Sequence, residues 1–119
     1  MYTLYHNPRC SKSRAALEYL QHNNIDVKVH EYLKSPLTHD ELLRLYQKLN
    51  QPIVQMIRIN DDAFKAMGLK LDTLGVDQGV EILCDNPVLL QRPILEGGNF
   101  AVIGRPLENI IEALNLSKG

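Results

Sequence analysis

Cys10 lies in the stretch His6-Asn7-Pro8-Arg9-Cys10, between a short apolar segment and a segment with helical periodicity. Pro8 disfavours helical geometry at Asn7, so we expect the helix to begin just after this proline. A thiol at a helix start faces unpaired N–H groups and the positive end of the helix dipole, and both lower its pKa. The position makes Cys10 a candidate nucleophile, although a small buried cysteine is the commoner role for any single cysteine.

The residues after Cys10 indicate what kind of thiol it is. A dithiol Cys-x-x-Cys motif would have cysteine at its fourth position, but here Ser13 stands there, so the motif is monothiol. An oxidised Cys10 then needs an external thiol such as glutathione, or Cys84 if the fold brings it close. Cys84 shares a predicted helical face with apolar residues, so we expect a core cysteine there. A phosphatase-like loop would need arginine at position 16, which is Ala16, and this disfavours that chemistry.

Three arginines stand at predicted boundaries between elements. Arg58 ends a short helical piece, Arg92 precedes Pro93 at the entry to a strand, and Arg105 follows a strand. Guanidinium groups bind tetrahedral oxyanions through forked, charge-assisted hydrogen bonds. Taken singly, each is better explained as a surface arginine without a role. If all three met near a thiolate they would form an anion pocket, and the sequence spacing leaves that open.

Other polar residues flank the candidate nucleophile. His6, four residues before Cys10, can hydrogen-bond the thiolate or steady the loop, and the second role is the commoner one. Arg9, Lys12 and Arg14 can lower the thiol pKa through their charge. For Arg9 and Lys12, a solvated position at the helix start is an equally good interpretation.

Composition excludes several functional classes. The 119 residues fit one domain, residues 1–119, with one core, and the net charge of −1 gives no argument for nucleic-acid or membrane-surface binding. No apolar run approaches the roughly 20 residues that span a bilayer, and the N-terminus lacks signal-peptide character. Two distant cysteines make no disulfide framework, and no Cys/His cluster has metal-ligand spacing. We expect a reduced, cytoplasmic, monomeric protein without a metal.

The hydrophobic pattern predicts strands at 2–5 and 27–30 with a helix between them that stops near Asn23-Asn24. This is a βαβ unit, so its strands should be parallel, and the second should be half-buried on one face. Thr38 and Glu41 form a capping box that opens another helix. Short helices without a strand are predicted from 51 to 90. Segments 93–95 and 100–103 predict an antiparallel hairpin, and a last helix follows Pro106.

This order, βαβ, a block of helices and then ββα, resembles a thioredoxin-like α/β domain. It predicts a mixed four-stranded sheet covered by helices, with a helical insertion at about 51–90. Such domains carry their redox cysteine between the first strand and the first helix, which is the position of Cys10.

Nearly the whole chain resembles the glutaredoxin-dependent arsenate reductase family of the ArsC type. The opening motif together with two later Arg-Pro pairs is a specific combination, whereas either half alone would be weak. Lys12 is a departure, because the best-studied members carry a small pair of residues at positions 11 and 12. The motifs that carry the resemblance are His6-Asn7-Pro8-x-Cys10 with Ser13-Arg14, Tyr32-Leu33-x-x-Pro36 with Thr38, Asp85-Asn86-Pro87, Arg92-Pro93-Ile94 and Arg105-Pro106.

The resemblance implies a mechanism. The thiolate of Cys10 would attack arsenate or a related oxyanion to form a covalent thioarsenate. Glutathione, a co-substrate, would condense with this adduct, glutaredoxin would reduce the mixed species, and arsenite would leave. No tightly bound cofactor is implied.

The resemblance also assigns roles to the other residues. His6 and Ser13 would assist the cysteine, and Asn7, Arg14 and Pro93 would support the site, with Pro93 in the cis form that this fold usually has beside the active cysteine. The arginines that would hold the substrate are Arg58, Arg92 and Arg105.

Two other functions stay open at this point. One is a thiol-stress transcription regulator resembling Spx, which binds RNA polymerase; those sensors usually carry a Cys-x-x-Cys switch, which Ser13 removes here. The other is a glutathione-linked thiol oxidoreductase that acts on a different oxidised substrate.

Overall fold

The computed structural model describes residues 1–118, which form two compact units. The first comprises Met1–Ser35 and the chain from Arg92 onward, and the second is Pro36–Gln91. The predicted helical block at 51–90 lies within the second unit, which begins earlier and takes in one more helix.

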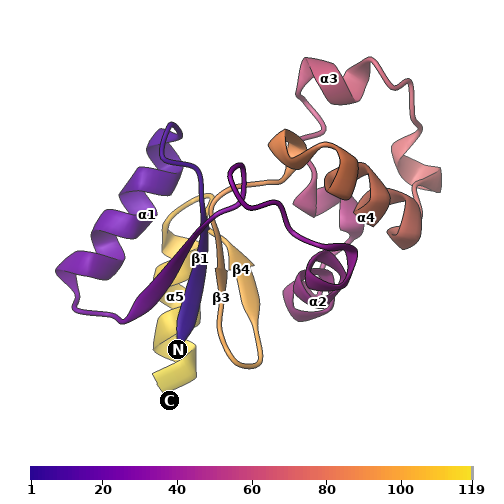
Figure 1. Ribbon diagram of the computed structural model, residues 1–119. Coiled ribbons are helices and arrows are strands. Elements are labelled where there is room, and N and C mark those ends of the chain that lie inside the picture. Colours follow the sequence, from indigo (N-terminus) through magenta and orange to yellow (C-terminus); the bar gives the residue numbers. More distant parts are fainter. Residues whose placement is uncertain (119) are drawn as a thin grey trace. The chain divides into compact units, whose positions relative to one another are not determined.

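The first unit is built on a mixed four-stranded sheet with the order β2-β1-β3-β4 (Figure 1). The strands are β1 (Tyr2–His6), β2 (Val27–Glu31), β3 (Ile94–Glu96) and β4 (Ala101–Ile103). β1 pairs in parallel with β2 and antiparallel with β3, and β3 pairs antiparallel with β4. The predicted βαβ unit and hairpin are confirmed, and the sheet has the thioredoxin-like arrangement.

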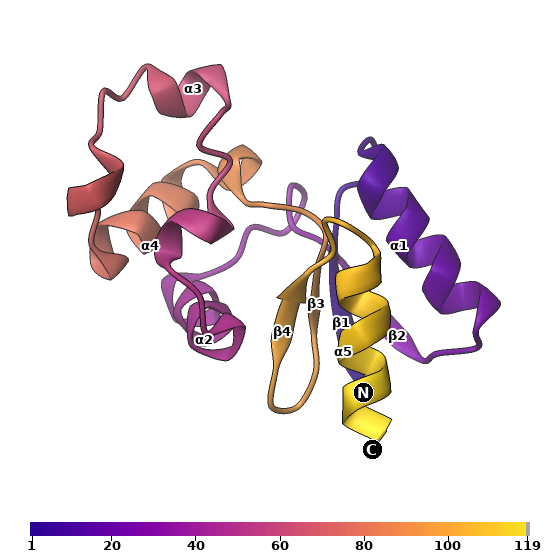
Figure 2. The same ribbon diagram turned by 180° about the vertical axis from the view of Figure 1, so that it is seen from behind.

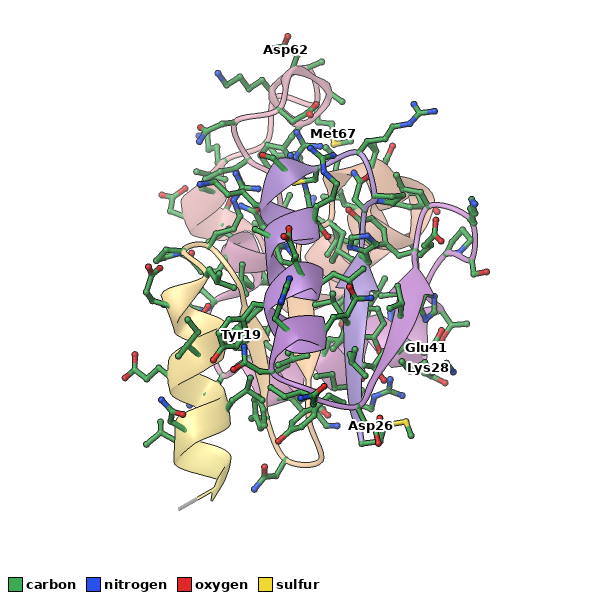
Figure 3. The ribbon with its side chains drawn as sticks, turned by 90° about the vertical axis from the view of Figure 1, so that its left-hand side faces the viewer. Tyr19, Asp26, Lys28, Glu41, Asp62 and Met67 are labelled. Atoms are coloured by element: carbon green, nitrogen blue, oxygen red, sulfur yellow. The ribbon has the colours of Figure 1, made fainter. Side chains whose placement is uncertain are left out.

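Two helices, α1 (Ser11–His22) and α5 (Glu108–Lys118), cover one face of this sheet (Figures 1 and 2). Tyr19 of α1 packs at the edge of their shared core, as Figure 3 shows. α1 ends where predicted, since Asn24 has a φ of 55°, a left-handed conformation that asparagine tolerates. The buried core consists of Leu4, Ala16, Leu20, Leu95, Ile110 and Leu114.

The strand β2 differs from its predicted burial. Alternation predicts that Val27 and Val29 share one buried face, but Val29 is 40% exposed while Val27 is half-buried. The reason is that β2 is the edge strand of the sheet, so part of its length has no covering element. Lys28 stands exposed at this edge (Figure 3).

The second unit is helical. It contains α2 (His39–Leu49), α3 (Asp62–Lys65) and α4 (Val76–Asp85), with short 3₁₀ turns η1 (Ile53–Met56), η2 (Leu71–Thr73) and η3 (Pro87–Leu89). α2 opens with the predicted capping box, because the Thr38 side chain accepts from the Glu41 N–H and the Glu41 carboxylate accepts from the Thr38 N–H.

No strand longer than one bridge occurs in the second unit. That bridge pairs Ile57 with Leu90, and the prediction of helices without a strand is otherwise confirmed. Throughout residues 1–118, no helix has both the length and the apolar character needed to cross a membrane.

Shortening a leucine side chain should lower the free energy of unfolding much more at a buried helix position than at an exposed one. Leu20 is fully buried on α1, so Leu20→Ala should lower the free energy of unfolding by about 2–5 kcal/mol. Leu116 on α5 is 76% exposed, and the matched change Leu116→Ala should cost less than about 0.5 kcal/mol. Urea denaturation followed by circular dichroism measures both; equal losses would contradict the core described above.

Candidate active site

Cys10 is the N-cap residue of α1, as the sequence predicts. Its φ of −93° and ψ of 123° are extended, while its carbonyl already accepts a hydrogen bond from the Arg14 N–H at 2.9 Å. The Cys10 N–H donates to the carbonyl of Asn7 at 3.0 Å, which closes the turn between β1 and α1. The thiol therefore stands over the open N–H groups of the first helical turn.

The environment of Cys10 lowers the pKa of its thiol below the ordinary value. Partial burial acts in the opposite direction, but it is outweighed by the polar backbone N–H groups of Ser13 and Lys12, which stabilise the charged sulfur, and by the positive charge of Arg92. The helix-start effect expected from the sequence is therefore present. Cys10 is a thiol predisposed to ionise and to act as a nucleophile.

The hairpin brings two of the three arginines together beside Cys10. Arg92 comes just before β3 and Arg105 just after β4, and the antiparallel register Ile94↔Ile103 places these two ends side by side. The Arg105 Nη1 lies 3.9 Å from the Cys10 Sγ and donates to the Arg92 carbonyl at 3.3 Å. Arg92 contributes charge to the same sulfur.

The peptide bonds that follow Arg92 and Arg105 have an unusual conformation. The Arg92–Pro93 peptide bond is cis, as expected for Pro93, and so is Arg105–Pro106, which the sequence analysis did not foresee. Between them, Gly104 donates from its N–H to the Pro93 carbonyl at 2.9 Å. A Cβ on Gly104 would lie 2.5 Å from a side-chain carbon of Ile110 and 3.0 Å from one of Pro93, so a larger residue here would have to displace these buried side chains.

Ser13 and His6 form a buried hydrogen-bonded pair beneath the loop. Ser13 is fully buried on α1, and its Oγ lies 2.6 Å from the His6 Nδ1 and accepts from the Asn7 N–H at 3.0 Å. The His6 contacts match the loop-steadying role considered above. Ser13 is thus a positioning residue through its side chain while its backbone N–H faces the thiol.

The pKa of His6 is lowered from its ordinary value. Burial is the largest cause, the nearby Glu31 carboxylate acts in the opposite direction, and Arg14 adds to the lowering. The neutral imidazole is therefore favoured at pH 7, and its Nδ1 shares a hydrogen bond with the Ser13 hydroxyl.

The predicted supporting residues also lie in this loop. The Asn7 Oδ1 accepts from the Arg9 N–H at 3.0 Å, and the Arg14 Nη1 donates to the Pro8 carbonyl at 3.0 Å. Both contacts fix the backbone on either side of Cys10. Arg14, which is the first exposed residue after Ser13, therefore stabilises the turn.

Two predicted residues lie in the second unit. Arg58 pairs with Asp61, with 3.4 Å between Nη2 and Oδ2, and its Nη1 donates to the Val88 carbonyl at 3.1 Å. That Arg58 joins the other two arginines stays a prediction. Cys84 on α4 is half-buried, and burial together with Asp85 and Glu81 raises the pKa of its thiol, the behaviour of an unreactive structural cysteine.

Within residues 1–118, no group of three or more His, Cys, Asp or Glu side chains is placed to hold a metal ion. Both cysteines are free thiols.

The fold and site define a thioredoxin-like protein with a single reactive thiol at a helix start and two guanidinium groups beside it. The chain belongs to the ArsC family, whose model matches residues 5–113. It is 43% identical over 108 residues to the arsenate reductase of Neisseria meningitidis, covering 90% of this chain and 92% of the relative. It is 32% identical over 112 residues to the arsenate reductase of Escherichia coli, covering 94% and 79%. The solved arsenate reductase of Vibrio cholerae superimposes with a TM-score of 0.88 at 35% identity, covering 93% and 95%.

Removing the Arg92 charge should raise the pKa of Cys10, because that charge stabilises the thiolate. In Arg92→Gln, the pH midpoint for alkylation of Cys10 by iodoacetamide should move to higher pH, read from the mass of the Cys10 peptide. The matched change Lys28→Gln, at the sheet edge, should leave the midpoint at the wild-type value. An unmoved midpoint in Arg92→Gln would contradict the electrostatic account of the thiol.

His6 should give stability a pH dependence. Its folded pKa lies below the unfolded value of about 6.5, so as pH falls through that value the unfolded chain binds a proton that the folded chain refuses. The free energy of unfolding from urea titrations should therefore decrease from about pH 7.5 to about pH 5.5, and His6→Gln should decrease less. His22→Gln, at an exposed position, should keep the wild-type dependence; an unchanged dependence in His6→Gln would show that His6 is not held neutral.

Proposed function

We propose that this protein is an arsenate reductase that uses glutathione and glutaredoxin. Its family membership and relatives bearing that name support the reaction class. The observation that carries the proposal is the placement of the Cys10 Sγ, a thiol of lowered pKa, 3.9 Å from the Arg105 Nη1 and beside Arg92. A nucleophilic sulfur next to two guanidinium groups suits attack on a tetrahedral oxyanion.

Arg92 and Arg105 are proposed to hold the oxyanion. The Arg92 Nε is buried and has no hydrogen-bond partner within residues 1–118, which is costly for a charged donor. An oxyanion oxygen would supply the missing acceptor. Arg105 is exposed, so its guanidinium can turn from the sulfur toward a bound anion. Arg58 is proposed as the third ligand on the strength of the family pattern alone.

The first chemical step is proposed at Cys10. Its thiolate attacks the arsenic atom of arsenate, a sulfur–arsenic bond forms, and one arsenate oxygen leaves as water after taking up protons. The N–H groups of Lys12 and Ser13 hold the thiolate before attack, and the guanidinium groups bind the negative charge on the arsenate oxygens. Arsenic keeps its oxidation state in this step.

Reduction is proposed to come from external thiols, because Ser13 replaces a second motif cysteine. Glutathione condenses with the adduct, and glutaredoxin reduces the mixed species. The two electrons that convert arsenate to arsenite come from these thiols, whose sulfurs end as disulfide. We infer that no tightly bound cofactor takes part, and that the protein works in the cytoplasm, where reduced glutathione is abundant.

A coupled assay tests the function. With glutathione, glutaredoxin, glutathione reductase and NADPH present, arsenate should accelerate NADPH oxidation by the wild-type protein. Cys10→Ser should lose at least about 10³-fold of this rate, because the nucleophile is gone. Cys84→Ser is the matched control and should retain the wild-type rate, since burial raises the pKa of the Cys84 thiol and makes it a poor nucleophile.

Two outcomes would count against the proposal. No arsenate-dependent oxidation, while Cys10 still alkylates as a low-pKa thiol, would favour a thiol oxidoreductase with another substrate. Loss of activity in Cys84→Ser equal to that in Cys10→Ser would contradict the monothiol mechanism. If arsenate-dependent oxidation is absent and the protein captures RNA polymerase in a pull-down, a transcription regulator would be favoured instead.

A further inference from the structure

Arg105 lies in the short connection between β4 and α5 (Figure 2), and the side chain of Asn109 contacts this connection from the first turn of α5. The Asn109 Nδ2 donates to the Ile103 carbonyl at 3.2 Å and to the Arg105 carbonyl at 3.3 Å. An amide nitrogen carries two hydrogens, so it can donate one to each carbonyl. One side chain therefore holds both the last residue of β4 and the arginine two residues after it.

The backbone on either side of Arg105 is hydrogen-bonded as well. Before it, the Gly104 N–H donates to the Pro93 carbonyl at 2.9 Å, and after it, the Asn109 N–H donates to the Pro106 carbonyl at 3.0 Å. Asn109 is half-buried, so its bonds are partly shielded from competing water. Asn109 thus fixes the connection through its backbone and through its side chain.

The position of the Arg105 guanidinium depends on this backbone. The residue is exposed, yet its Nη1 lies 3.9 Å from the Cys10 Sγ and donates to the Arg92 carbonyl at 3.3 Å. An exposed arginine side chain has many rotamers, and holding one of them at the sulfur has an entropic cost. A fixed Cα limits the positions that the guanidinium can reach, and a displacement of about 1 Å in a site is enough to lower a rate strongly.

We propose that Asn109 is a positioning residue, which fixes the backbone of Arg105 so that its guanidinium stays beside the Cys10 sulfur. The inference rests on the proposed function for what the guanidinium holds, an oxyanion, but not for where the guanidinium lies. Asn109 acts through Arg105 and not through contact with the substrate.

Two alkylating reagents report the position of Arg105 without arsenate. Iodoacetate is anionic and iodoacetamide is neutral, and both alkylate the Cys10 sulfur with loss of iodide. The quantity compared is the ratio of their second-order rate constants, read from the mass of the Cys10 peptide, because this ratio cancels changes in the thiolate fraction. A guanidinium beside the sulfur attracts the anionic reagent. In Asn109→Ala the ratio should fall about threefold, and in Arg105→Gln at least as far.

A double variant separates positioning from a general loss of structure. If Asn109 acts through Arg105, Asn109→Ala should leave the ratio unchanged in an Arg105→Gln background. In the coupled assay with arsenate, Asn109→Ala should raise KM about threefold and change kcat less, since oxyanion binding weakens while the Cys10 nucleophile is intact.

Asn115→Ala is the matched control, because Asn115 is an exposed asparagine further along the same helix. It should keep the wild-type ratio and the wild-type KM. A wild-type ratio in Asn109→Ala, a fall that Asn115→Ala reproduces, or an equal fall in the Arg105→Gln background would overturn the proposal. If the ratio falls only when Arg105 is present but arsenate gives no rate in the wild type, the proposed function fails while the positioning role of Asn109 is supported.

Discussion

The negative charge on the Cys10 sulfur is the interaction on which this site depends. Burial alone would disfavour it, and three sources offset burial: the N–H groups of Ser13 and Lys12 and the Arg92 guanidinium. Each source requires the first turn of α1 to stand at the end of β1. That placement rests on the apolar core under α1, and on the buried Ser13–His6 contact that fixes the turn. The low pKa of the thiol is thus a property of the packed unit.

The second contribution comes from a distant part of the chain. The hairpin of β3 and β4 lies about ninety residues after Cys10. Its register brings the start of β3 beside the end of β4, and Arg92 therefore lies next to Arg105. Pairing of β3 with β1 then sets both guanidinium groups next to the thiol. The close packing at Gly104, against Ile110 and Pro93, leaves the end of β4 little freedom.

The sequence predicted the parts of this arrangement that depend on local chemistry. Pro8, the Thr38 capping box and apolar alternation located the strands and helices, and the monothiol motif singled out Cys10. Burial of β2 was predicted wrongly at Val29, because spacing cannot show that a strand lies at a sheet edge. Contacts between residues far apart in the chain, such as Arg105 with Cys10, came from the resemblance and not from spacing. The cis bond at Arg105–Pro106 had no sequence signal that we recognised.

We propose that a tetrahedral oxyanion binds next to the Cys10 thiolate, beside Arg92 and Arg105. The most direct test is the rate at which iodoacetamide alkylates Cys10, followed by peptide mass spectrometry at increasing arsenate concentration without any reductant. The account predicts saturable protection of Cys10 in the wild type, weakened in Arg105→Gln. An alkylation rate that does not change with arsenate would contradict it.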